Sequence, residues 1–173
     1  MMTIAALGEL MGSLLAYPRE DYRERLEACI RALQEDYTRP GQLLESFRDR
    51  IRALPLEDLE ELYTQTFDIN PVCCLEVGWQ LFGEEYARGA FLVDMRRMLQ
   101  ECAIPESKEL PDHMSHALAL LDRLGPQPAR TLAVEAVLPA LKKMLAALAG
   151  KENPFEIVLT TIESVLHERF AAR

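Results

Sequence analysis

Three side chains that could carry acid–base or metal chemistry stand together in ELPDHMSHALALL, residues 109–121. Asp112 and His113 are adjacent and His116 follows three residues later, so a helix would place both imidazoles on neighbouring parts of one face. Zinc or iron would need further ligands, and His167 is the only other histidine, so Asp or Glu from elsewhere would have to complete the site. One hypothesis is therefore a metal-dependent hydrolase or oxidase that uses Asp112, His113 and His116.

A helix start is the simpler interpretation of the same stretch. On a helical wheel, the buried face consists of Met114, Ala117, Leu118, Leu121 and Leu124. His113 then lies at the border of this face and His116 on the polar side, so we expect both histidines at a solvent-exposed rim. Asp112 would cap the helix, or Pro111 would begin it and Asp112 would have no part in the cap.

Arg88 is the other ionisable side chain that the pattern singles out. It precedes Phe91 and Leu92 by three and four residues, so in a helix its guanidinium points to their apolar face. An unpaired buried charge is costly, so either a carboxylate pairs with Arg88 or its stem extends to solvent. The candidate carboxylates are Asp68, Glu76, Glu109 and Asp112. Gly89 is a poor helix former, and it predicts that another helix approaches closely here.

The usual catalytic motifs are missing from the sequence. There is no glycine-rich phosphate loop, no G-x-S-x-G and no H-E-x-x-H. The four cysteines form no C-x-x-C pair. Cys73 and Cys74 are more simply explained as small buried residues than as a vicinal disulfide or a thiophilic metal site. Trp79 and Phe82 are expected in the core, with the lining of a groove as the alternative for one of them.

These residues are expected on the helices of one all-α domain that spans residues 1–173. Apolar residues recur at spacings of three and four in segments 4–15, 22–37, 43–54, 56–67, 91–102, 114–124, 134–148 and 162–170. INPVCC and IPESKELP are the expected irregular connections, RPGQ is expected to lead into a helix, and GPQP is expected to be a turn. Pro139 predicts a kink, and Asn153 predicts the N-cap of the last helix.

The balance of charge narrows the class of partner. The chain has 28 acidic and 19 basic residues, a formal net charge of -9, which argues against nucleic-acid binding through a basic face. An acidic surface attracts a basic partner such as an arginine-containing peptide, although solubility alone also explains the charge. No apolar run is long enough to span a bilayer, and the N-terminus lacks the basic region of a signal peptide. We therefore expect a cytoplasmic protein with reduced thiols and without direct membrane insertion.

Three stretches in one order carry a family resemblance. YTQTFD (63–68), FGEEYARGAFLVDM (82–95) and ELPDHMSHALALL together resemble the NarJ branch of the NarJ/TorD/DmsD family of assembly chaperones for molybdenum-containing redox enzymes. The most specific parts are the G-x-x-x-x-R-G step from Gly83 to Gly89 and the E-L-P-D-H step from Glu109 to His113. The chain departs from the family where EVGWQLFG replaces the E-H-x-H-G stretch of nitrate reductase chaperones, and this departure leaves the client enzyme open.

The resemblance implies an all-helical fold of the TorD/NarJ-like chaperone type without enzymatic activity or a cofactor of its own. It implies that the protein binds the N-terminal segment of an apo molybdoenzyme catalytic subunit, such as that of a nitrate reductase. This segment is often a twin-arginine signal or a relic of one. The chaperone would hold that subunit until the molybdenum cofactor is inserted, and the insertion machinery is a further candidate partner. A helical adaptor in a stable complex remains an alternative from another functional class.

The resemblance also implies a role in client handling for Pro111, Asp112 and His113. Joining this to the pattern of residues, we predict that ELPDHMSHALALL is a surface that receives a basic client peptide. Glu109 and Asp112 would supply negative charge and His113 a polar contact. The predicted peptide-binding residues are Glu109, Leu110, Pro111, Asp112, His113 and His116. The predicted supporting residues are Arg88, Gly89, Asp68 and Glu76.

Overall fold

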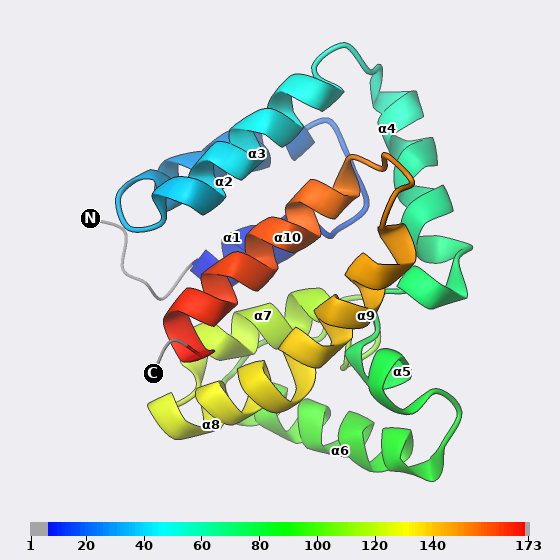
Figure 1. Cartoon of the computed structure of the whole chain (residues 1–173). Helices are drawn as coiled ribbons and strands as arrows, with labels where there is room; N and C mark the ends of the chain where they lie inside the picture. Colours follow the sequence, from blue (N-terminus) through cyan, green and yellow to red (C-terminus); the bar gives the residue numbers. More distant parts are fainter. Residues whose placement is uncertain (1–6, 172–173) are drawn as a thin grey trace.

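The structure, a computed structural model, describes residues 7–171, and this part of the chain is all-α as predicted (Figure 1). The α-helices are α1 (Leu7–Ser13), α2 (Tyr22–Gln34), α3 (Thr38–Ile51), α4 (Leu56–Tyr63), α5 (Val77–Phe82), α6 (Tyr86–Glu101), α7 (Met114–Arg123), α8 (Pro126–Leu132), α9 (Leu138–Leu148) and α10 (Phe155–Leu166). Three π-helical turns, η2 (Thr64–Asp68), η4 (Ala133–Val137) and η5 (His167–Ala171), continue α4, α8 and α10, and η3 (Pro71–Cys73) is a 3-10 turn. Between residues 7 and 171 there is no strand, only an isolated bridge.

The helices pack around one continuous apolar core. α2 and α3 form a hairpin, α10 packs against α3, and α9 packs against α10 (Figure 1). α1 packs on α7, and α7 lies with α5, α6 and α8 in the lower half of the same view. Aromatic rings meet where α3, α4 and α10 converge, with the Phe155 centroid 5.6 Å from that of Phe47 and 5.9 Å from that of Tyr63.

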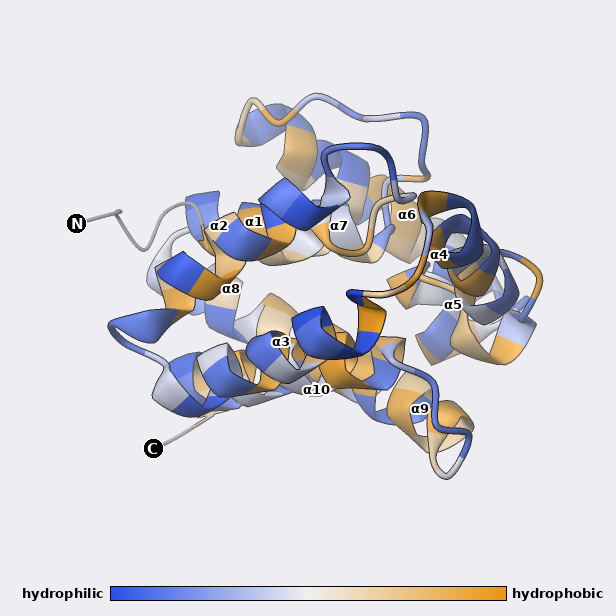
Figure 2. Ribbon diagram, turned by 90° about the horizontal axis from the view of Figure 1, so that it is seen from above, coloured by the Kyte–Doolittle hydropathy of each residue, from blue (hydrophilic) through white to orange (hydrophobic). Residues whose placement is uncertain are grey.

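Helical periodicity predicts the buried faces well. In α2, the buried side chains are Tyr22, Leu26, Cys29, Ile30 and Leu33, all of them members of the expected stripe. Hydrophobic and hydrophilic colours alternate along most helices in Figure 2, as expected when each helix buries one face. Full burial of such a side chain contributes about 1.5–3 kcal/mol. None of the helices in the described part of the chain has both the length and the apolar character needed to cross a membrane.

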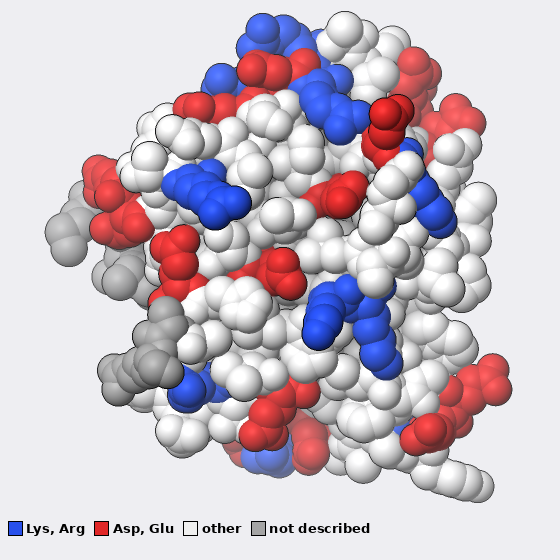
Figure 3. Space-filling model, viewed as in Figure 1, with Lys and Arg blue, Asp and Glu red and all other residues white. Residues whose placement is uncertain are grey.

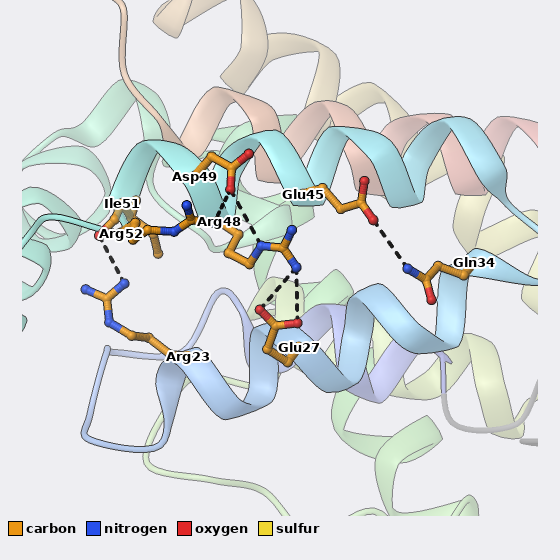
Figure 4. Close-up of polar contacts among 8 residues, drawn as sticks. All are labelled: Arg23, Glu27, Gln34, Glu45, Arg48, Asp49, Ile51 and Arg52. Atoms are coloured by element: carbon orange, nitrogen blue, oxygen red, sulfur yellow. Dashed lines mark hydrogen bonds and ion pairs between the residues drawn. The ribbon is translucent and has the colours of Figure 1, made fainter.

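Charged side chains join helices at the surface. Between α2 and α3, Arg48 Nη1 lies 3.3 Å from Glu27 Oε2 (Figure 4). Arg23 Nη1 donates to the carbonyl oxygen of Ile51 at 3.0 Å, at the end of α3. On the face drawn in Figure 3, acidic and basic side chains are interspersed among uncharged ones. Partly exposed ion pairs of this kind contribute at most about 1 kcal/mol each.

Two proline-containing segments lie in the first turns of helices. The prediction that RPGQ leads into a helix is confirmed, whereas the prediction of a turn at GPQP is wrong. RPGQ belongs to the first turn of α3, which begins at Thr38, and α8 begins at Pro126, so GPQP is not a separate turn. Proline is tolerated in a first turn because its missing N–H group would have no intrahelical acceptor there. The π-helical turn η4 ends at Val137, two residues before Pro139, and the Leu138 N–H bonds to the Ala133 carbonyl oxygen. The predicted cap of α10 is confirmed, because Asn153 Oδ1 accepts from the Phe155 N–H at 2.9 Å.

Candidate functional site

The isolated bridge lies two residues beyond the ends of the two irregular connections that the sequence predicts. The Val77 N–H donates to the Asp112 carbonyl oxygen at 2.8 Å, and the Met114 N–H donates to that of Leu75 at 2.7 Å. Glu76 is thereby paired with His113. This backbone contact places the segment before α5 beside the segment before α7, and most of the predicted site residues gather around it.

Asp112 is fully buried beneath this bridge. Its Oδ2 accepts from the Gly78 N–H at 2.9 Å and lies 3.5 Å from Arg88 Nη2. Of the four carboxylates predicted as partners of Arg88, Asp112 is therefore the one that pairs with it. Burial raises the pKa of Asp112 above its ordinary value, and the Arg88 guanidinium and the Gly78 N–H oppose that rise. Asp112 thus connects α6, α5 and the segment before α7, and it is not an exposed charge.

Gly78 is the glycine that permits this close packing. A Cβ at residue 78 would lie 2.6 Å from Asp112 Oδ2 and 2.9 Å from Phe91 Cδ1. The prediction for Gly89 is wrong, because Gly89 is exposed and a Cβ there would meet nothing within 4 Å. Low helix propensity alone does not reveal which face of α6 a glycine occupies. The start of a short helix after an irregular segment was the signal for Gly78 that the sequence analysis missed.

His113, rather than Asp112, caps α7. Its Nδ1 accepts from the Ser115 N–H at 3.2 Å and lies 2.7 Å from Ser115 Oγ, so the ring is neutral with its proton on Nε2. His113 is 3% exposed. Burial, together with the neighbouring His116, lowers the pKa of His113 to about 4. The imidazole therefore replaces the side-chain oxygen that usually caps a helix.

His116 anchors the segment between α6 and α7. Its Nδ1 donates to the Leu110 carbonyl oxygen at 2.8 Å, and its Nε2 accepts from the Ser107 N–H at 3.2 Å. Because a carbonyl oxygen only accepts, Nδ1 carries the proton. The predicted position of both histidines at a solvent-exposed rim is wrong, since His116 is 4% exposed. The wheel assumed that α7 buries one face, whereas the 103–113 segment folds over the face that carries His116.

A second element covers α7 from another side. In α1, Gly8 and Gly12 lie one turn apart on one face, and a Cβ at Gly8 would collide with the Leu118 carbonyl oxygen. A Cβ at Gly12 would lie 3.2 Å from Ser115 Cα. Asp122 Oδ1 accepts from the Gly8 N–H at 3.0 Å, so a side chain of α7 binds the free N–H groups at the start of α1. Two small residues four apart were a signal in the sequence for this contact.

Three carboxylates from three segments converge beside the bridge. Glu109 is exposed, and partial burial followed by the charges of Glu76 and Asp68 raises its pKa. The same three carboxylates, after burial itself, help to raise the pKa of Tyr63, which lies in the core beneath them. None of the three forms an ion pair with a residue of the described part of the chain. We call Asp68, Glu76 and Glu109 the acidic cluster.

Exposed apolar side chains accompany the acidic cluster along the chain. Ile69 is 69% exposed, Val72 58% and Leu110 48%, and each belongs to a segment that contributes a carboxylate. Leu110 directly follows Glu109, and Ile69 directly follows Asp68. Exposed apolar surface with a rim of polar side chains is typical of a surface that a partner covers.

The comparison with known families decides the class of protein. The family model for the nitrate reductase delta subunit matches residues 4–151. The chain belongs to the nitrate reductase delta subunit family. No curated protein matches it. This family consists of molybdoenzyme assembly chaperones and is not a catalytic family, and the resemblance stated from the sequence is confirmed.

The delta-subunit match covers every residue discussed so far in this site. It runs from α1 to the end of α9 and stops before α10. The acidic cluster, the Arg88–Asp112 pair and both buried histidines all lie within it. Family membership also implies a nitrate reductase catalytic subunit as a partner.

The geometry does not favour the metal hypothesis for this delta-subunit family member. Both ring nitrogens of His116 and the Nδ1 of His113 have protein partners, and Asp112 is bound to Gly78 and Arg88. Within residues 7–171, no group of three or more His, Cys, Asp or Glu side chains is arranged to hold a metal ion. The three residues instead fix the path of the segment that carries Glu109 and Leu110.

An apolar groove lies on a different part of the molecule. It has a volume of about 500 Å³, and α5, α6, α8 and η4 line it, with Phe82 and Phe91 in its wall. These two ring centroids are 5.8 Å apart. The alternative prediction, that one of the two aromatic residues lines a groove, is therefore confirmed for Phe82. Trp79 is half-buried beside Arg88.

Proposed function

We propose that the chain binds the N-terminal segment of an apo molybdoenzyme catalytic subunit, of the nitrate reductase class, and holds that subunit for molybdenum cofactor insertion. The observation that carries this proposal is the acidic cluster of Asp68, Glu76 and Glu109 with Ile69, Val72 and Leu110 exposed on the same segments. The negative charges of Glu76 and Asp68 help to raise the pKa of Glu109, and an approaching cation relieves this like-charge repulsion. A segment with basic and apolar side chains, as in a twin-arginine-like signal, has the chemistry that suits this surface.

The buried residues of the site have a different role in this proposal from the exposed ones. Asp112, His113 and His116 fix the backbone from Ser107 to Met114 through hydrogen bonds. Glu109 and Leu110 lie within that fixed segment and project to solvent. A preformed surface of this kind loses little conformational entropy on binding. A larger part of the interaction energy therefore contributes to the affinity.

Calorimetric titration with the N-terminal peptide of a nitrate reductase catalytic subunit from the same genome tests the proposal. Glu109→Gln keeps the shape of the side chain and removes one charge, so we expect weaker binding, by about threefold to tenfold, at unchanged Tm. Glu24→Gln, which removes an exposed charge from α2, is the matched control and should bind like the unmodified protein. Equal affinities for all three proteins would refute the role of the acidic cluster.

The adaptor alternative differs in what happens after maturation. A chaperone leaves when the cofactor is in place, whereas a structural subunit stays. Affinity purification of the catalytic subunit from cells with and without molybdate separates the two. We expect this chain to copurify with the cofactor-free subunit and to be missing from the cofactor-loaded one. Stoichiometric copurification with the active enzyme would favour the adaptor.

A further inference from the structure

The pairing of Arg88 with Asp112 leaves hydrogen-bonding capacity unused. A guanidinium and a carboxylate can form two parallel bonds, but here a single contact of 3.5 Å joins Nη2 to Oδ2. Asp112 Oδ1 and Arg88 Nε are both buried without a hydrogen-bond partner among the described residues. Asp112 is nevertheless 0% exposed, so it is a desolvated carboxylate with one free acceptor atom.

The surroundings of Arg88 have the form of a guanidinium-binding site. The Arg88 Cζ lies 5.6 Å from the centroid of the Trp79 ring, while the Asp112 carboxylate lies at the head of the guanidinium. The Arg88 side chain is 21% exposed, so the site reaches solvent through the space that this side chain fills. Gly78 allows the carboxylate and the Arg88 stem to approach the start of α5.

We infer that Arg88 is an internal occupant of this site and that an arginine of the client segment replaces it on binding. This inference rests on the proposed function and names the client group that is recognised. One guanidinium replaces another, so Asp112 keeps a partner, and the incoming group gains Oδ1 by approaching with both of its NH2 groups. Glu84 and Glu85, which are exposed and come immediately before α6, four and three residues ahead of Arg88, are candidates to receive the displaced side chain.

The exchange predicts a preference that simple charge attraction does not produce. A lysine ammonium cannot form the forked contact with both carboxylate oxygens, and it interacts with an aromatic face differently from a guanidinium. The site should therefore take arginine in preference to lysine at one position of the client segment. The acidic cluster, by contrast, should accept either cation.

Peptide titration against Arg88→Ala tests the exchange. Removing the internal competitor should tighten binding of the arginine peptide by about tenfold, because the open site is no longer occupied. The gain should disappear when the relevant peptide arginine is replaced by lysine, and the surface variant Arg96→Ala should show no gain. Unchanged or weaker binding by a folded Arg88→Ala protein would overturn the inference, whereas absence of binding to the unmodified protein would overturn the proposed function instead.

A second measurement does not require peptide binding and applies if Arg88→Ala is too unstable for titration. Methylguanidinium at millimolar concentration should raise the Tm of Arg88→Ala more than methylammonium at equal ionic strength, because it refills the site beside Asp112 and Trp79. The unmodified protein, in which Arg88 occupies the site, should show no such difference. Equal Tm values of Arg88→Ala in the two salts would show that no site for a free guanidinium exists.

Discussion

Arg88 illustrates at the residue scale how a charge placed on an apolar face indicates a partner. The sequence predicted that Arg88 either pairs with one of four carboxylates or extends to solvent, and Asp112 proves to be the partner. The choice among the four depended on the bridge between the 75–77 and 112–114 segments, which no periodicity encodes. The sequence also did not predict that Asp112 is buried. Acidic residues are rarely buried unless they are paired, and the pairing itself depended on the bridge.

Arg88→Ala should destabilise the fold far more than a surface substitution on the same helix. The change leaves the Asp112 carboxylate buried without its cation, at a cost of about 3 kcal/mol. Arg96, whose side chain is 54% exposed, is the control, and Arg96→Ala should cost less than about 1 kcal/mol. Urea denaturation of both variants measures the difference, and equal midpoints would mean that Arg88 contributes only its stem.

His113 should make stability fall with acidity. Its pKa is about 4 in the folded protein, below the ordinary 6.5, so its contribution is complete above pH 6.5 and is lost as pH falls toward 4. At pH 5 the loss is about 2 kcal/mol relative to pH 7. The raised pKa values of Asp68, Glu109 and Asp112 act in the opposite direction, because these groups favour the fold at low pH.

A matched variant separates the pH effect of His113 from that of these carboxylates. His113→Gln has no imidazole to protonate, while the carboxylates remain. The unfolding free energy of the unmodified protein should therefore fall more steeply between pH 7 and pH 5 than that of His113→Gln. Chemical denaturation at both pH values gives the comparison. Parallel pH dependence of the two proteins would contradict the burial of a neutral His113.

At the scale of elements, spacing predicted the helices and their buried faces but not what covers them. The stripe of α2 and the cap at Asn153 follow from local rules, and both are present. The prediction that His116 is exposed was wrong because α7 is covered on more than one side. This coverage depends on contacts with other segments of the chain, which spacing does not predict. Low helix propensity drew attention to Gly89, whereas the tightest contacts involve Gly8 and Gly78.

Two glycine substitutions should therefore have opposite effects. Gly8→Ala places a Cβ against the Leu118 carbonyl oxygen, a backbone atom that cannot move without separating α1 from α7, so it should cost about 1–3 kcal/mol. Gly89→Ala improves helix propensity in open space and should stabilise by about 0.5–1 kcal/mol. Thermal unfolding distinguishes them. A stabilised Gly8→Ala would show that the α1–α7 contact is looser than described.

At the scale of the whole molecule, the acidic composition alone did not locate a site. Acidic and basic side chains are interspersed on the face seen in Figure 3, and the net charge of -9 does not say where carboxylates lack partners. The fold brings Asp68, Glu76 and Glu109 together from three segments. The family resemblance predicted the class of protein, and the residue pattern around it predicted Glu109 as a client contact. That Ile69 and Val72 are also exposed near this carboxylate required the structure.

Site-specific photocrosslinking tests most directly whether this surface receives the client. A photoreactive phenylalanine analogue at position 110, where Leu110 is 48% exposed, should crosslink in cells to the N-terminal segment of the catalytic subunit. The same analogue at position 134, where Val134 is 37% exposed on η4, is the control and should give little product. Mass spectrometry of the crosslinked peptides identifies both partners. Crosslinking from position 134 without any from position 110 would contradict the placement of the client beside the acidic cluster.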